Sequence, residues 1–167
     1  MKNHILMLAR YNQWANRRLY DCVAAAGEEA FTRPMGAFFG SLCGTLNHIL
    51  VADCIWLRRI TGEGPQPTAL NTILHDTLGA LRAARDAADD RILATTAWLN
   101  AEALAGTLDY RTTAGVAQSN TLSHVLLHVF NHQTHHRAQA HTLLSQVGQE
   151  APVLDLLYFL RDNPTAG

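Results

Sequence analysis

Apolar residues recur every three or four positions through most of the chain, and this spacing constrains the fold more than any other feature. In the first 26 residues it places one stripe of apolar side chains along a helix. The stripe contains Ile5, Leu8, Tyr11, Ala15, Leu19, Cys22 and Ala26. Gly27 follows directly, and glycine commonly follows the last turn of a helix. The pattern therefore predicts an amphipathic helix over residues 1–26.

A second helix is expected over residues 41–61. Ser41 is a suitable N-cap, and Gly62 would end the helix before a loop rich in glycine and proline at residues 62–67. The preceding residues 28–40 also contain proline and glycine together with two adjacent phenylalanines. They predict a connection with its own apolar anchor.

A third helix is expected over residues 71–99. Its apolar positions alternate steps of four and three, which is typical of helices that pack in a bundle. Two polar residues, Arg85 and Thr95, interrupt this repeat.

The last third of the chain combines a further helix with less regular sequence. Residues 100–118 have partly strand-like composition and fit a short hairpin or an ordered loop equally well. A fourth helix is expected to begin at residues 119–121 and to end near residue 147, before Gly148. One or two helical turns should follow Pro152 and reach Arg161.

Four long helices predict an all-α fold, namely an antiparallel four-helix bundle with a short C-terminal helix. We expect a single domain over residues 1–167, because no repeat or low-complexity tract divides the sequence. Such bundles form ligand and metal sites from inward-facing side chains of neighbouring helices.

Composition and charge argue against several functions. Hydrophobic residues make up 48% of the chain and charged residues 16%, as in globular domains. The 13 basic and 14 acidic residues nearly cancel, which leaves no positive surface for nucleic acid. No apolar segment is long enough for a membrane span or a signal-peptide core. We therefore expect a cytoplasmic protein that binds neither nucleic acid nor membranes, with its three cysteines as free thiols.

Nine histidines are the unusual feature of the composition, and five of them lie within residues 124–136. These five are His124, His128, His132, His135 and His136. Side chains three or four residues apart project from the same side of a helix and can share a metal ion. Helix geometry favours His132 as one ligand and leaves its partner open among His128, His135 and His136.

A catalytic metal centre usually has three protein ligands, so a third must come from another helix. His48 is the best candidate, because it lies among apolar neighbours in the second helix, where an unpaired imidazole would be costly. The remaining histidines, His4, His75 and His141, look peripheral. Side chains that can orient such ligands are Tyr11, Asn47, Asp53 and Gln139.

Other hydrolytic sites have no support in the sequence. No glutamate stands beside the histidine pair as the H-E-x-x-H pattern of metalloproteases requires. Ser123 is near histidines but has no G-x-S-x-G turn around it.

The sequence resembles the DinB family of small four-helix-bundle proteins, which is grouped with thiol-dependent enzymes. The resemblance covers nearly the whole chain and is carried by four segments: Tyr11–Leu19, Gly44–Trp56, Asn131–Gln139 and Asp155–Leu160. It implies a divalent-metal site whose ligands are His48, His132 and His136. Ala138 departs from the family, which often has glycine there.

This resemblance also implies a function. Three neutral imidazoles suit Zn, Ni, Fe or Mn as the divalent ion and leave coordination positions open for water or substrate. We expect a homodimeric, metal-dependent enzyme, a thiol transferase or hydrolase, acting on a small-molecule substrate. It would activate a low-molecular-weight thiol or water for transfer to, or hydrolysis of, a small electrophile. The alternative is a non-catalytic metal- or ligand-binding protein of the stress response.

Overall fold

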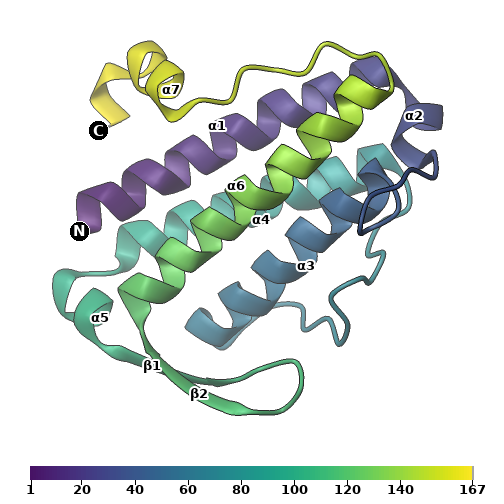
Figure 1. The fold of residues 1–167 in the computed structure, drawn as a ribbon. Helices are drawn as coiled ribbons and strands as arrows, with labels where there is room; N and C mark the ends of the chain where they lie inside the picture. The colour runs from purple at the N-terminus through teal and green to yellow at the C-terminus, as the bar shows by residue number, and fades with distance from the viewer. Residues whose placement is uncertain (167) are drawn as a thin grey trace.

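The computed structural model describes residues 1–166 and consists of a four-helix bundle with a small hairpin at one end (Figure 1). The long helices are α1 (Lys2–Ala26), α3 (Leu42–Thr61), α4 (Leu78–Trp98) and α6 (Leu122–Gln146). Three short helices, α2 (Glu28–Thr32), α5 (Ala101–Ala105) and α7 (Leu156–Asp162), and a final 3-10 turn (Pro164–Ala166) complete the helical part. The all-α bundle with a short C-terminal helix is therefore confirmed.

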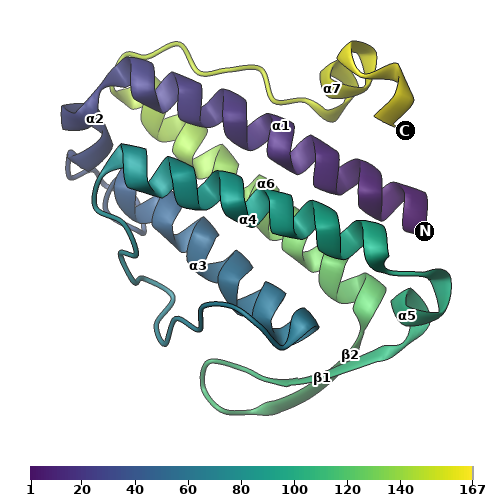
Figure 2. The same cartoon turned by 180° about the vertical axis from the view of Figure 1, so that it is seen from behind.

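The bundle is antiparallel in the pairs α1 with α4 and α3 with α6, whereas α3 and α4 run in the same direction (Figures 1 and 2). Residues 62–77 make this possible, because they cross back along the bundle between the end of α3 and the start of α4. This long connection lies beside α3 and contributes to the site described below.

The start of α4 differs from the prediction of a helix from residue 71. Residues 71–77 remain in the loop, where the side chain of Asn47 supplies backbone partners for two of them. Asn47 Oδ1 accepts from the N–H groups of Leu74 and His75, and its Nδ2 donates to the His75 carbonyl. The helix then begins after Thr77, whose side chain accepts from the Ala80 N–H as an N-cap.

The region before α6 forms the hairpin alternative. Strand β1 (Thr107–Arg111) pairs antiparallel with β2 (Ala117–Thr121), with Thr107 opposite Thr121. The strand takes up residues 119–121, so α6 starts at Leu122, one residue after the predicted range of starts. The short helices α2 and α5 were not predicted, since neither is long enough to show a periodic pattern.

A polar network crosses the middle of the bundle and links all four long helices. Arg85 pairs with Asp53 of α3 and, at 3.0 Å, with Asp89 of its own helix. Asp53 also accepts from Gln133, which in turn accepts from Arg137 of α6. The α1 members are Asn12 and Asn16, which donate to Asp89 and accept from Arg137.

This central network explains why a charged residue interrupts the apolar repeat of the third helix. Arg85 is only 2% exposed and therefore occupies a core position, where it meets two carboxylates. Apolar clusters lie on both sides of the network, one centred on Leu46, Leu81 and Leu144, the other on Leu57, Ile92 and Phe130. In the part of the chain that the structure describes, no helix is long and apolar enough to cross a membrane.

Candidate metal centre

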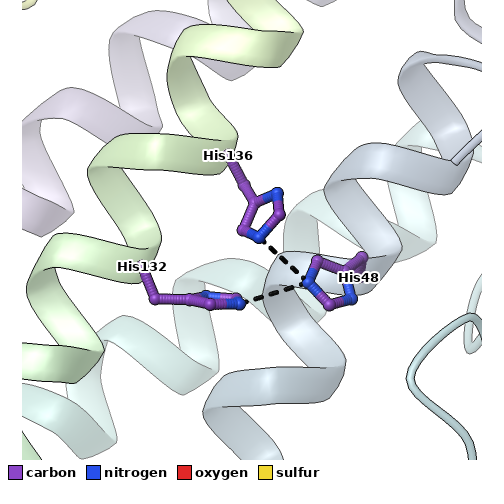
Figure 3. A group of neighbouring side chains, drawn as sticks. All are labelled: His48, His132 and His136. Carbon is purple, nitrogen blue, oxygen red and sulfur yellow. Dashed lines mark hydrogen bonds between the residues drawn. The ribbon is translucent and has the colours of Figure 1, made fainter. Parts of the chain in front are cut away.

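Three histidine side chains meet between α3 and α6. His48 lies in the second turn of α3, and His132 and His136 lie one turn apart on the facing side of α6. Their rings converge on one point (Figure 3). The two helices pack side by side, and the four-residue spacing on α6 directs both of its rings toward His48.

The separations of the Nε2 atoms suit a single bound ion. The Nε2 atom of His48 lies 3.2 Å from that of His132 and 3.2 Å from that of His136 (Figure 3). One potential ligand atom from each of the three residues lies within 4.8 Å of the others. Two nitrogens bound at zinc distances in a tetrahedral site would lie about 3.3 Å apart. The three histidines can therefore hold a metal ion.

The outer ring nitrogens fix the tautomers of two of these histidines. His48 Nδ1 lies 2.8 Å from the Leu70 carbonyl oxygen, and His136 Nδ1 lies 2.8 Å from Gln139 Oε1. Because both partners only accept, each Nδ1 carries the proton and each Nε2 presents a lone pair. Two lone pairs 3.2 Å apart repel each other unless a cation lies between them. The donor set therefore fits a divalent metal ion by its chemistry as well as by its geometry.

Burial keeps the imidazoles in the neutral form that metal binding requires. Desolvation, and then the neighbouring His136, His48, His128 and His135, lower the pKa of His132 to about 3. Desolvation also lowers the pKa of His48 against the opposing effect of the Leu70 carbonyl, and the pKa of His136 against that of Gln139.

An aromatic ring covers one side of the cluster. Phe39 stacks on His48 with ring centroids 3.9 Å apart and meets His136 edge to face at 5.6 Å. Gly44 allows this approach, because a Cβ atom there would lie 1.9 Å from the Phe39 carbonyl oxygen. Of the two adjacent phenylalanines in the predicted apolar anchor of residues 28–40, Phe39 thus lies over the candidate site, whereas Phe38 is 89% exposed.

The structure brings His48, His132 and His136 together and places the alternatives outside. The ring of His128 is one turn before His132 and packs on Trp56. The exposed ring of His135 packs edge to face on that of His136 with centroids 4.7 Å apart, and its Nε2 lies 3.4 Å from Gln139 Nε2, so His135 is not one of the converging ligands. His124 is exposed near the start of α6.

The four predicted orienting side chains have different roles. Gln139 binds His136 directly, and Asn47 holds the loop whose Leu70 carbonyl accepts from His48. Asp53 belongs to the buried polar network, and the Tyr11 hydroxyl donates to the Leu154 carbonyl near α7. Sequence reasoning missed Leu70, since a backbone carbonyl in a loop has no signature in the sequence.

Comparisons with known proteins give a family match, a similar sequence and a similar fold. The model of the family described as "DinB family" matches residues 1–165. A similar protein, Protein DinB of Bacillus subtilis, is 23% identical over 165 residues, which cover 96% of this chain and 95% of the relative. The crystal structure of a DinB-like protein from Bacillus cereus has a similar fold, with a TM-score of 0.65 and 17% identity over 86% of this chain and 91% of that one.

Proposed function

The chain belongs to the DinB family, and from that premise we propose that His48, His132 and His136 bind a divalent metal ion and form the centre of a metal-dependent enzyme. The observation that carries this proposal is the pair of Nε2 lone pairs, on His48 and His136, that face each other at 3.2 Å. In the proposed reaction a low-molecular-weight thiol, or water, loses its S–H or O–H proton and forms a bond to a small electrophile, while a bond of the electrophile breaks and its electron pair takes up a proton.

The residues of the chain have separate tasks in this proposal. The three imidazoles would hold the ion, which supplies Lewis acidity that lowers the pKa of a thiol or water. Leu70 and Gln139 keep two rings in the required tautomer. Phe39 excludes water from one side of the cluster. Zn, Ni, Fe and Mn all suit three imidazoles, so the metal is identified by measurement.

The metal content of untagged protein, purified without added metal, tests the site. We expect close to one divalent ion per chain in wild-type protein and in His128→Ala and His135→Ala, whose rings lie outside the cluster. In His48→Ala, His132→Ala and His136→Ala we expect the ion to be lost. Loss of metal in His135→Ala and not in His136→Ala would overturn the ligand assignment.

Turnover tests the chemistry separately from the site. Wild-type protein with graded metal content should consume thiol and electrophile at rates proportional to occupancy, and the thiol sulfur should end bonded to the electrophile. The reduced cytoplasm that we expect for this protein would keep such a thiol available. Stoichiometric metal without turnover would instead support the non-catalytic binding protein of the stress response.

The proposal includes a homodimer. Large apolar side chains on α7 support an interface, since Leu157 is 62% and Tyr158 50% exposed. Sedimentation equilibrium should give twice the monomer mass. A monomer at all concentrations would remove the dimer from the proposal and leave the metal site untouched.

A further inference from the structure

A cavity of about 480 Å3 lies beside the last turns of α3. It is bounded by α3, the loop that follows it and the hairpin, which Figure 1 shows next to this end of α3. Its walls include Ile55, Arg59, Thr68 and Tyr110. The volume is in the range of sites for small molecules.

The charge of this cavity differs from that of the chain as a whole. Three arginines, Arg58, Arg59 and Arg111, line it together with one acid, Asp109. In the described part of the chain none of the three arginines has a carboxylate within 4.0 Å. A chain with a net charge of -1 thus gathers three cations around one small cavity.

Backbone carbonyls hold the three guanidinium groups in place. Arg58 donates to the Gly64 carbonyl at 2.7 Å, Arg59 to the Arg111 carbonyl at 2.7 Å, and Arg111 to the Gly115 carbonyl at 2.8 Å. A guanidinium has five N–H donors, so each keeps donors for a ligand.

Arg59 is fixed further by two aromatic rings. Its Cζ atom lies 4.5 Å from the centre of the Trp56 ring and 4.8 Å from that of Tyr110. These rings pack edge to face with centroids 5.0 Å apart. A cation held in this way loses little side-chain entropy when it binds an anion.

The arginine cavity lies close to the histidine cluster along the loop and along α3. Thr68 lines the cavity, and two residues later the Leu70 carbonyl accepts from His48. Ile55 and Arg59 follow His48 by seven and eleven residues and share its helix face, about 10 and 16 Å along the axis. On α6 the ring of His128 lies between Trp56 and His132. Its centroid is 5.5 Å from that of Trp56 and 5.9 Å from that of His132.

We propose that this cavity binds the carboxylate end of an anionic small thiol and thereby directs its sulfur toward His48, His132 and His136. The inference rests on the proposed function and adds the substrate class. A guanidinium matches a carboxylate with two parallel hydrogen bonds. Because Ile55 in the cavity wall lies about 10 Å along α3 from His48, the ligand must be a flexible molecule that carries its thiol away from its carboxylates.

The test compares ligands that differ only in their carboxylates. Full-length protein loaded with Co2+ is titrated with glutathione and with glutathione diethyl ester, and the thiolate-to-cobalt absorption reports binding. We expect the free acid to bind at least about tenfold more tightly. Arg59→Gln and Arg111→Gln should each remove most of this preference. Arg82→Gln, a control on α4 that is paired with Asp21, should keep it.

A second arm needs no metal and separates the two proposals. Calorimetry measures the affinity of S-methylglutathione for the His132→Ala protein and for the same protein with the additional Arg111→Gln change. Binding that depends on Arg111 supports the cavity even if the metal proposal fails. Equal affinity of acid and ester for cobalt-loaded wild type would overturn the cavity inference and leave the metal proposal standing. Tighter binding of inorganic phosphate than of succinate would overturn the assignment to carboxylates.

Discussion

The bundle contains two clusters of buried polar side chains, one that links all four long helices and one between α3 and α6, and they differ in how their charges are balanced. The central network contains two arginines, Arg85 and Arg137, and two aspartates, Asp53 and Asp89, with amides between them. The two positive and two negative charges cancel there, although Arg85 Nε and Nη2 make no hydrogen bond to any residue that the structure describes. The histidine cluster lies five residues before Asp53 on α3 and directly beside Gln133 and Arg137 on α6. It brings Nε2 atoms together with nothing of opposite charge among them.

This difference separates a structural site from a binding site. A balanced buried network fixes the register of the helices and needs no ligand. The facing lone pairs of His48 and His136 are unfavourable by themselves and become favourable when a cation enters. The network holds the two helices together close to the histidines and so keeps the imidazoles facing each other in the absence of metal.

The largest effect should come from breaking the charge balance of the network. Asp89→Asn leaves Arg85 and Arg137 with a single carboxylate inside the core. The free energy of unfolding should fall by about 3–5 kcal/mol, because removal of one partner leaves a buried charge uncompensated. Urea unfolding measures the loss.

Asp90→Asn is the matched control for this network variant. Asp90 is the next residue of α4, is exposed, and accepts from Gln13 of α1 at 2.8 Å. Loss of the Asp90 carboxylate should lower the free energy of unfolding by less than about 1 kcal/mol. The folded fraction of Asp89→Asn should still bind metal. Similar losses of stability in the two variants would show that the network is not the structural element described here.

Much of the fold could be predicted from the sequence, because the long helices are periodic and end at glycines such as Gly27 and Gly62. The start of α4 could not, since Asn47 stabilises residues 74–75 of the loop from another helix. The histidines within α6 were evident from their spacing. The pairing of His136 with Gln139 is also local, since the two are three residues apart on α6. The pairing of His48 with Leu70 depends on tertiary structure, which no sequence pattern encodes.

A smaller effect should follow from removing the group that orients His136. Gln139→Met keeps the length of the side chain but removes the oxygen that accepts from Nδ1. The ring can then adopt the other tautomer, and metal affinity should fall about tenfold or more, as for other partners of metal-binding histidines. Gln139→Glu retains an acceptor and should keep wild-type affinity. Competition with a chelator measures both, and equal affinity of Gln139→Met and wild type would show that Gln139 does not orient the ligand.

The smallest effect concerns the metal-free protein and its response to acid. Burial lowers the pKa of His132 to about 3 in the folded state, whereas an unfolded histidine titrates near 6.5. Between these values the unfolded chain binds more protons than the folded one, so stability falls as the pH is lowered through 6.5. Burial raises the pKa of Asp53 to about 6, against the attraction of Arg85, and this acts in the opposite direction over about pH 4–6.

Comparison with His132→Ala cancels the Asp53 contribution, because both proteins contain the network. With a chelator present, the decrease in unfolding free energy from pH 7.5 to 5.5 should be about 1 kcal/mol smaller in His132→Ala, after allowance for solvent screening of the half-buried ring. His124→Ala, which removes an exposed histidine of the same helix, should behave as wild type. An equal pH response in His132→Ala and wild type would mean that the histidine cluster accepts protons as readily as water-exposed histidines. Burial would then not keep its imidazoles neutral for a metal ion, and the contrast with the network would fail.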